Sequence, residues 1–456
     1  MKANVSAANP WPLRVYWLVA AIGFAAILAL NLPGQMTVDS TYQLYEGRSG
    51  HRLTFNPWIM SWLLGRFDAV TPGTGLFMAA NAALLMVSLG VLPRLTVRPV
   101  GWGAPVVLAL VLATPQLVNF QGIVWKDVLF ANLAIAGFVT LALALRQGVP
   151  AWRNLIAPLL LFAVGGLVRQ NGLIAAGLAA LTLGVVLGRT AGWRRGAAYG
   201  AGGFAAVLAL AGLLGSALQP TVSELKNANT VGLRVIQHYD IVGAVAADPA
   251  FDLSDLPPER AVVIRAEGPR FYSDERTDGF DQSPALTRAL WQTPKDRLAA
   301  AWTGMILERP GLYLTHRLKV FGQVFLTPSI ERCGPIAAGV AGPADILAKL
   351  RIAPGVDGRD AWLRRYAGAF FATPVFSHLT YAVLALAVAG ILALRRRPAD
   401  VAMIGLMLSG LGFAASFLFL SIACDYRYLY MLDLSALAGL VYVALDPPWL
   451  NRSGNT

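Results

Sequence analysis

The run Leu13–Leu32, LRVYWLVAAIGFAAILALNL, contains a single charged residue, Arg14, and it decides the fold class. A helix of about 20 apolar residues, rising 1.5 Å per residue, crosses the roughly 30 Å hydrocarbon core of a bilayer. This run is too long for the core of a signal peptide, and no small-residue cleavage site follows it. We therefore expect a retained membrane helix that also directs insertion.

Nine further apolar stretches follow the first, and the composition agrees with them: 56% of the 456 residues are hydrophobic, 14% are charged and the mean hydropathy is +0.57. This pattern predicts an all-α integral membrane protein with about ten transmembrane helices. The fifth and sixth stretches are separated only by Arg169-Gln170-Asn171, so they form either a tight hairpin or one broken helix. The ten stretches lie near 13–32, 76–93, 103–120, 128–145, 155–168, 172–188, 197–218, 370–394, 401–421 and 428–445.

The distribution of lysine and arginine orients these helices. With both termini in the cytoplasm, the cytoplasmic ends carry 13 basic residues and the short outer loops carry 6. The other 18 of the 37 lie in the segment 219–369, which is set aside because long loops translocate regardless of their charge. The bias predicts a multi-pass protein of the bacterial inner membrane with both termini cytoplasmic.

Two segments are then expected on the periplasmic side. The long first loop, 33–75, mixes polar groups with aromatic residues, a composition typical of short helices that lie in the membrane interface. The segment 219–369 holds 17 of the 25 carboxylates and is interpreted as a small domain. Within it, charges and Pro310 interrupt the apolar stretch 298–325, which predicts one or two membrane-surface helices rather than a span.

The predicted organisation has three parts: an N-terminal transmembrane bundle over 1–218, the periplasmic segment 219–369, and the C-terminal transmembrane helices and cytoplasmic tail over 370–456. Two cysteines, Cys333 and Cys424, make no metal-ligand pattern. Both are expected outside, in an oxidising compartment, where they either pair as a disulfide or remain two unrelated thiols.

Several function classes are disfavoured. The net charge of +12 would suit nucleic acid, but there is no basic tract with interleaved aromatics, and the arginines sit at helix ends. No nucleic-acid partner is therefore expected. The chain has no Walker motif, Gly-x-Ser-x-Gly elbow or dinucleotide fingerprint, and its four histidines lack ligand spacing.

Asp39, in GQMTVDSTYQ just after the first span, has two interpretations. As a general base it would accept a proton from a hydroxyl group. As an N-cap it would begin a short helix at Ser40, and position alone favours the cap. Trp125-Lys126-Asp127, before the fourth span, also has two interpretations. In the first, Lys126 binds an anionic group and Asp127 positions Lys126 or a metal. In the second, Trp125 is an interfacial belt residue, Lys126 extends to the interface and Asp127 caps the helix.

Arg169-Gln170-Asn171-Gly172 is more informative, because an arginine between two apolar stretches is costly to place without a partner or ligand. Its planar fork suits phosphate, and the alternative is an ion pair with Asp127 or another carboxylate. Cys424-Asp425-Tyr426-Arg427-Tyr428 opens the last span. In one interpretation its tyrosines line a groove for a lipid phosphate or sugar, and Arg427 binds the negative charge of the phosphate. In the other, the aromatic residues form an interfacial belt and Asp425 caps the helix. Asp433, deeper in that helix, needs a partner there.

Taken together, these features resemble the GT-C class of polytopic membrane glycosyltransferases. The resemblance rests on Val38-Asp39-Ser40-Thr41-Tyr42 after the first span, the outer loop ending in Asn56-Pro57-Trp58, the clusters at 125–127 and 169–172 on the same side, and Asp425-Tyr426-Arg427-Tyr428 after a long outer segment. It covers most of residues 13–445 and is greatest to bacterial members with no assigned substrate.

The resemblance implies a polyprenyl-phosphate sugar donor, an acceptor on the outer face of the membrane (an envelope glycan, lipid or protein) and inversion at the anomeric carbon. Asp39 matches the family's catalytic base. Lys126, Arg169 and Arg427 match phosphate-binding cations. The supporting residues are Asp127, Gln170, Asn171, Asp425, Tyr426 and Tyr428. Many relatives carry two adjacent acidic residues where this chain has Asp39-Ser40, so a Mg or Mn cofactor and the acceptor stay open.

Two other functions are weighed against this one. A transporter or flippase for a lipid-linked or anionic substrate should carry polar groups near the middle of the bilayer and often an internal repeat. Here the charges gather at one end of the bundle and no repeat is visible. A polysaccharide polymerase or a head-group transferase is the third candidate, and the latter would want a Ser or Thr nucleophile with metal ligands.

Overall fold

The computed structural model describes residues 9–146, 148–224 and 228–447 and is 76% helical. Within this part of the chain, eight helices are long and apolar enough to cross a membrane, or nine if one bent pair counts as a single span. The prediction of an all-α polytopic membrane protein is confirmed.

The ten predicted stretches all contain helix, but two of them fall short of a simple span. α8 (Ile156–Val168) has only 13 residues. The stretch predicted at 103–120 bends by 62° between α5 (Gly103–Leu112) and the segment that begins with α6 (Pro115–Val118). Thr114 has an extended backbone there because the ring of Pro115 disfavours the helical conformation in the preceding residue.

The chain divides into two compact units. Unit 1 comprises Met1–Glu224, Ile336–Phe413 and Leu429–Thr456, and unit 2 comprises Leu225–Pro335 and Ala414–Tyr428. The predicted periplasmic segment 219–369 is thus shared between them. Unit 1 also contains a two-residue parallel pairing of β1 (His51–Arg52) with β2 (Val222–Ser223). The other helices of unit 1 are α1 (Trp11–Asn31), α2 (Val38–Ser49), α3 (Trp58–Val70), α4 (Gly75–Val91), α7 (Lys126–Leu145), α9 (Leu173–Ala191), α10 (Trp193–Ala217), α16 (Ala344–Leu350), α17 (Gly358–Gly368), α18 (His378–Arg395), α19 (Pro398–Leu420, shared with unit 2 after residue 413) and α20 (Tyr430–Leu445).

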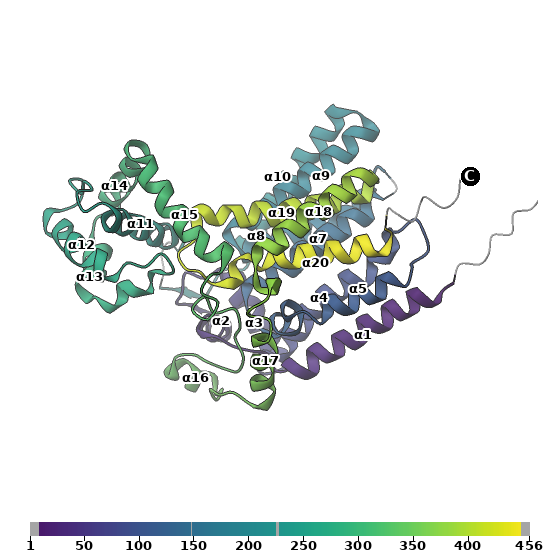
Figure 1. Ribbon diagram of the computed structural model, residues 1–456, viewed down its shortest axis with the longest axis horizontal. Coiled ribbons are helices and arrows are strands. Elements are labelled where there is room, and N and C mark those ends of the chain that lie inside the picture. Colours follow the sequence, from purple (N-terminus) through teal and green to yellow (C-terminus); the bar gives the residue numbers. More distant parts are fainter. Residues whose placement is uncertain (1–8, 147, 225–227, 448–456) are drawn as a thin grey trace, which may run out of the picture. The chain divides into compact units, whose positions relative to one another are not determined.

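The centre of unit 1 is formed by α7 and α20, which pack against each other (Figure 1). In the most apolar 18 residues of each helix, 89% of the residues of α7 and 83% of those of α20 are buried. The corresponding shares are 17% for α1 and 11% for α10. α7 and α20 are therefore the core helices of the bundle, whereas α1 and α10 leave most of their surface for lipid.

Polar side chains in this core bond to one another. The Asn132 amide nitrogen donates to the Asn81 side-chain oxygen (2.9 Å) and to Gln121 (2.9 Å), and Gln121 donates to the Tyr430 hydroxyl (2.8 Å). Asp433 has the partner that its depth requires: its carboxylate lies 2.8 Å from Nδ1 of His378. Such pairing is what a bilayer demands of buried polar groups.

The first loop forms two short helices, α2 and α3, as predicted. They approach closely through Gly47 and Gly65, where an added Cβ would come within 1.9 Å and 2.2 Å of the facing backbone oxygens. Arg48 forms a two-pronged pair with Asp68 (2.9 and 2.6 Å). Burial opposes ionisation of Asp68, but the hydrogen bonds from Arg48 and from the Gly73 amide outweigh it and lower the pKa of that carboxyl. The two helices of the loop are thus held together by a close glycine contact, and the Arg48–Asp68 pair joins them as well.

Unit 2 is helical and has its own core. Its helices are α11 (Ala228–Ala247), α12 (Pro258–Phe271), α13 (Pro284–Gln292), α14 (Lys295–Glu308) and α15 (Pro310–Leu326). The stretch 298–325 is split at Arg309–Pro310 between α14 and α15, and neither is a candidate span, as predicted. The buried Asp240 carboxylate accepts from Trp302 (2.7 Å) and pairs with Arg317 (2.7 Å), both in this unit.

Cys333 and Cys424 form a disulfide with a Cα–Cα distance of 5.0 Å, which confirms that they pair. The bond joins the end of the main segment of unit 2 to the segment that follows α19, across 91 residues of sequence. In a chain-entropy model, closing a loop of that length stabilises the fold by about 4 to 5 kcal/mol. The bond links these two segments of unit 2 directly to each other.

Candidate functional site

Asp39 lies in the first turn of α2, and it is not the N-cap. The cap is Thr37, whose backbone N–H donates to the Ser40 hydroxyl (3.2 Å), and the helix begins at Val38. The cap interpretation of Asp39 was wrong because the Thr37–Ser40 pair satisfies this helix start. The Asp39 side chain is half-buried, at a helix end where the dipole favours a negative charge.

Backbone pairing brings this helix start to the segment that precedes α7. The Gln35 amide donates to the Gly122 carbonyl (2.8 Å), and the Val124 amide donates to the Gln35 carbonyl (3.0 Å). The Ser40 hydroxyl donates to the Val124 carbonyl (2.7 Å). The Trp125 indole completes the contact by donating to the Thr37 hydroxyl (3.0 Å). Main-chain and side-chain hydrogen bonds thus hold together residues that are some 85 positions apart in the sequence.

Asn56 connects the two predicted site residues in this region. Its amide nitrogen lies 3.4 Å from Oδ1 of Asp39, and its amide oxygen accepts a hydrogen bond from the Lys126 ammonium group. Asn56 is itself 5% exposed, and the Arg52 guanidinium group holds its carbonyl (2.9 Å). A carboxylate and an ammonium group, both half-buried, are therefore held on either side of one fixed amide.

Asp127 and Arg169 form a buried ion pair beside this arrangement. Their side chains are 2% and 10% exposed, and the Arg169 guanidinium group also lies 5.4 Å from the ring centre of Phe413. The partner foreseen for Arg169 is thus present. Asp127, in the first turn of α7 after the N-cap Trp125, does not cap the helix and instead neutralises this arginine.

The turn after Arg169 is a short 3-10 helix, Gln170–Gly172. Gly172 packs against Gly165: an added Cβ would lie 2.7 Å from the Gly165 carbonyl oxygen. A continuous helix would separate these two residues by about 10 Å, so the chain turns sharply here. Gln170 is exposed at this turn and Asn171 is half-buried.

The last predicted cluster lies in unit 2. The Arg427 guanidinium group is 3.2 Å from the Asp425 carboxylate and 5.9 Å from the ring centre of Tyr428. Tyr426 is buried, and its amide donates to the Cys333 carbonyl (3.1 Å). Tyr428 stacks on Phe417. The four predicted residues of this cluster are thus gathered next to the disulfide.

The donor set does not suit a metal held by protein carboxylates alone. Among the residues that the structure describes, no three His, Cys, Asp or Glu side chains gather into a group that could hold a metal ion. The charged groups named above are instead the Asp39 carboxylate, the Lys126 ammonium group and the Asp127–Arg169 ion pair. Such a set can take up a proton and bind an anion.

Sequence reasoning assigned no role to Asn56. It was visible only as part of Asn56-Pro57-Trp58, at the end of the loop. The signal that could have found it is Pro57, because a proline restricts the backbone of the residue before it to extended conformations.

Comparison with solved structures finds remote similarities. The archaeal oligosaccharyltransferase AglB from Archaeoglobus fulgidus, in complex with an inhibitory peptide and a dolichol-phosphate, is 14% identical, over 95% of this chain and 50% of that one, with a TM-score of 0.44. ArnT from Cupriavidus metallidurans is 15% identical, over 94% and 77%, with a TM-score of 0.36. The arabinosyltransferase EmbB from Mycobacterium smegmatis is 15% identical, over 95% and 41%, with a TM-score of 0.33.

All three are polytopic membrane glycosyltransferases of the GT-C fold, the class named from the sequence. The chain spans half the length of AglB and less than half that of EmbB. No family model and no curated protein sequence matches the chain. With TM-scores below 0.5, the similarity says nothing about individual residues, whose roles rest on their own geometry.

Proposed function

We propose that the chain is a membrane glycosyltransferase that moves a sugar from a polyprenyl-phosphate donor to an acceptor hydroxyl, with inversion at the anomeric carbon. The contact of Asp39 with Lys126 through Asn56 carries the proposal, together with the sequence resemblance. It supplies a proton acceptor and a cation at a fixed spacing. These are the two groups that transfer from a phosphate leaving group needs.

In the proposed reaction the acceptor hydroxyl oxygen bonds to the anomeric carbon while the bond from that carbon to the phosphate oxygen breaks. The bonding electrons leave with polyprenyl phosphate, and the hydroxyl proton passes to Asp39. Lys126 stabilises the negative charge that develops on the phosphate. Inversion requires base and phosphate on opposite faces of the anomeric carbon, so Asp39 and Lys126 are proposed to lie on opposite sides of the bound sugar. No step passes through a metal ion.

Arg169 is proposed to bind the donor phosphate as well, with its ion pair to Asp127 holding the guanidinium group in position. Gln170 and Asn171, on the turn that follows, are proposed to contact the donor head group through their amides. The acceptor is proposed to be an envelope glycan, lipid or protein, reached at the periplasmic face of a bacterial inner membrane. The disulfide in unit 2 supports this placement, because such bonds persist in oxidising compartments.

From the sequence resemblance, Arg427 is proposed to bind donor phosphate, with Asp425, Tyr426 and Tyr428 of the same unit supporting it. Arg427→Lys keeps the charge but loses the planar fork, so part of the donor affinity should be lost. Arg427→Ala should lose about 2 to 5 kcal/mol of donor binding if the phosphate is left without its partner. Equilibrium binding of a polyprenyl-phosphate sugar measures the donor affinity of both variants. Wild-type affinity in folded Arg427→Ala would show that Arg427 does not bind the donor.

Asp39→Asn tests the proposal directly. Asparagine keeps the shape of the side chain but cannot accept the proton, so turnover should fall by roughly 100-fold or more while donor binding persists. The assay is release of polyprenyl phosphate by purified protein given candidate polyprenyl-phosphate sugars and an acceptor. Asp345→Asn is the matched control, because Asp345 is also an acidic residue in the first turn of a short helix of unit 1.

Three outcomes bear on the proposal. Near wild-type transfer by folded Asp39→Asn would show that Asp39 is not the base. Movement of a lipid-linked substrate across vesicles without any release of polyprenyl phosphate would favour the transporter instead. An equal loss of turnover in Asp345→Asn would mean that only the lost helix-end charge matters.

A further inference from the structure

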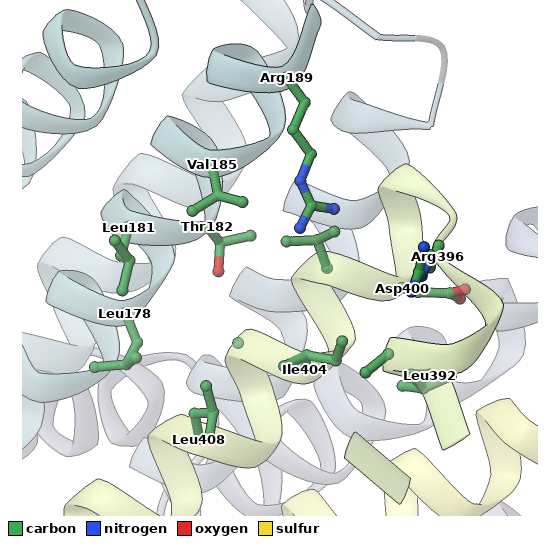
Figure 2. Close-up of a pocket in the computed structure, with 13 residues that line it drawn as sticks. Leu178, Leu181, Thr182, Val185, Arg189, Leu392, Arg396, Asp400, Ile404 and Leu408 are labelled. Carbon is green, nitrogen blue, oxygen red and sulfur yellow. The ribbon is translucent and has the colours of Figure 1, made fainter. Parts of the chain in front are cut away.

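A cavity of about 500 Å³ opens between α9 and the α18–α19 hairpin in unit 1, apart from every residue of the proposed reaction (Figure 2). Its walls are mainly aliphatic, from Leu178 and Leu181 on α9 to Ile404 and Leu408 on α19. Two arginines, Arg189 and Arg396, also line it. The volume is in the range of pockets that bind small ligands.

The two arginines lie at one end of the cavity. Arg189 is in the last turn of α9, and Arg396 is the C-cap residue of α18. Figure 2 shows the Arg189 side chain extending from α9 toward the cavity, with Arg396 beside Asp400 on the other wall. Both guanidinium groups are exposed, and neither forms an ion pair with a carboxylate in the described part of the chain.

Asp400, the only acidic residue in the described lining, is already neutralised. Its carboxylate accepts hydrogen bonds from the Arg395 guanidinium group (2.5 to 3.1 Å), the Arg397 amide (3.1 Å) and the Tyr442 hydroxyl (2.8 Å). The cavity therefore presents two uncompensated positive charges to an occupant. These charges favour a ligand whose anionic group lies at the arginine end of the cavity.

The apolar part of the cavity matches one leaflet in length. Leu178 and Arg189 are separated by 11 positions on α9, which is roughly 16 Å at 1.5 Å per residue. Half of a hydrocarbon core is about 15 Å. Leu181 is 60% exposed and Leu408 is 42% exposed, so the walls face the region where lipid lies. In hydrocarbon, lipid chains rather than water fill such a hollow.

We infer that this cavity binds an anionic phospholipid of ordinary chain length from the leaflet on the arginine-rich side. One acyl chain lies along α9 and α19, and the phosphate lies between Arg189 and Arg396. Arginine binds phosphate through paired hydrogen bonds, which suits this position. A polyprenyl chain is far longer than the cavity and is the less suitable occupant.

Native mass spectrometry of the full chain in detergent tests the inference, with phosphatidylglycerol and phosphatidylcholine of identical acyl chains as probes. Wild type should retain phosphatidylglycerol in preference. The double variant Arg189→Gln/Arg396→Gln should lose roughly ten- to thirtyfold in affinity for it, because each basic group near an anionic lipid contributes about 1 kcal/mol. Arg153→Gln/Arg194→Gln removes two exposed arginines that do not line the cavity and should bind as wild type.

A second variant, Leu408→Trp, keeps both arginines and fills the apolar wall, so it should also lose the lipid. Full phosphatidylglycerol binding by the arginine variant or by Leu408→Trp would overturn the site. An equal loss in the Arg153/Arg194 control would reduce the effect to general surface charge. Displacement of phosphatidylglycerol by equimolar polyprenyl phosphate would overturn the choice of occupant.

Discussion

At Arg169 the chain places a guanidinium group at the break between two apolar helices, where a charge without a partner would be too costly to bury. Asp127 compensates the buried charge by forming an ion pair with Arg169, and the ring of Phe413 lies against the guanidinium group. The pair is structural as it stands. A role in donor binding has to be separated from its role in folding.

We expect Arg169→Gln and Asp127→Asn each to lower the free energy of unfolding by about 3 to 5 kcal/mol, because each leaves a buried charge without its partner. The double variant Arg169→Met/Asp127→Leu should recover most of that loss, since an apolar pair needs no compensation. Thermal unfolding in detergent gives the stabilities, and equilibrium binding gives the donor affinity.

Single variants as stable as wild type would contradict the ion pair. If the folded double variant binds donor as tightly as wild type, Arg169 takes no part in donor recognition and only Lys126 remains as the phosphate ligand of unit 1.

Among the elements, α11 contains a histidine whose charge state should govern local stability. Burial, reinforced by the charge of Arg234, lowers the pKa of His238 from 6.5 to about 3. The Arg234 guanidinium donates to Nε2 of His238 (3.3 Å), which fits a neutral imidazole, and the ring lies edge-to-face against Trp291.

This shift predicts a dependence of stability on pH. Unfolded His238 takes up a proton below pH 6.5 and the folded form does not until pH nears 3, so stability is full above pH 6.5 and is lost as pH falls below it. The loss should reach about 2 kcal/mol at pH 5. Amide exchange of α11 in the full chain, corrected for the intrinsic rates, measures it.

His238→Gln should flatten this dependence, whereas the exposed His51 changed to Gln should leave it unaltered. An α11 whose exchange protection stays constant between pH 7 and pH 5 in wild type would contradict a neutral, buried His238.

For the whole molecule, the order of the helices and the basic turns predict on which side of the membrane each unit lies. α10 leads into unit 2, and α18 and α19 are joined by the turn that carries Arg396. Basic turns stay in the cytoplasm. The disulfide in unit 2 agrees, because its formation needs an oxidising environment.

Reporter fusions test this sidedness. A reporter fused after Gly268 should be active only if it functions outside the cytoplasm, and a reporter fused after Arg396 should be active only if it functions inside. Both termini are expected in the cytoplasm. Cytoplasmic activity of the Gly268 fusion would reverse the predicted topology and place every proposed catalytic residue on the wrong face.

The sequence by itself determined the helical membrane architecture, the short helices of the first loop and the interruption of the apolar stretch 298–325. These depend on hydropathy and on local breaks. Only the tertiary structure decided that Cys333 pairs with Cys424, that Asp39 contacts Asn56 and that Asp127 is the partner of Arg169. The reason is physical: hydrophobicity is a property of a local stretch, whereas the Gln35–Val124 pairing and the buried charges depend on helices packing across long sequence separations.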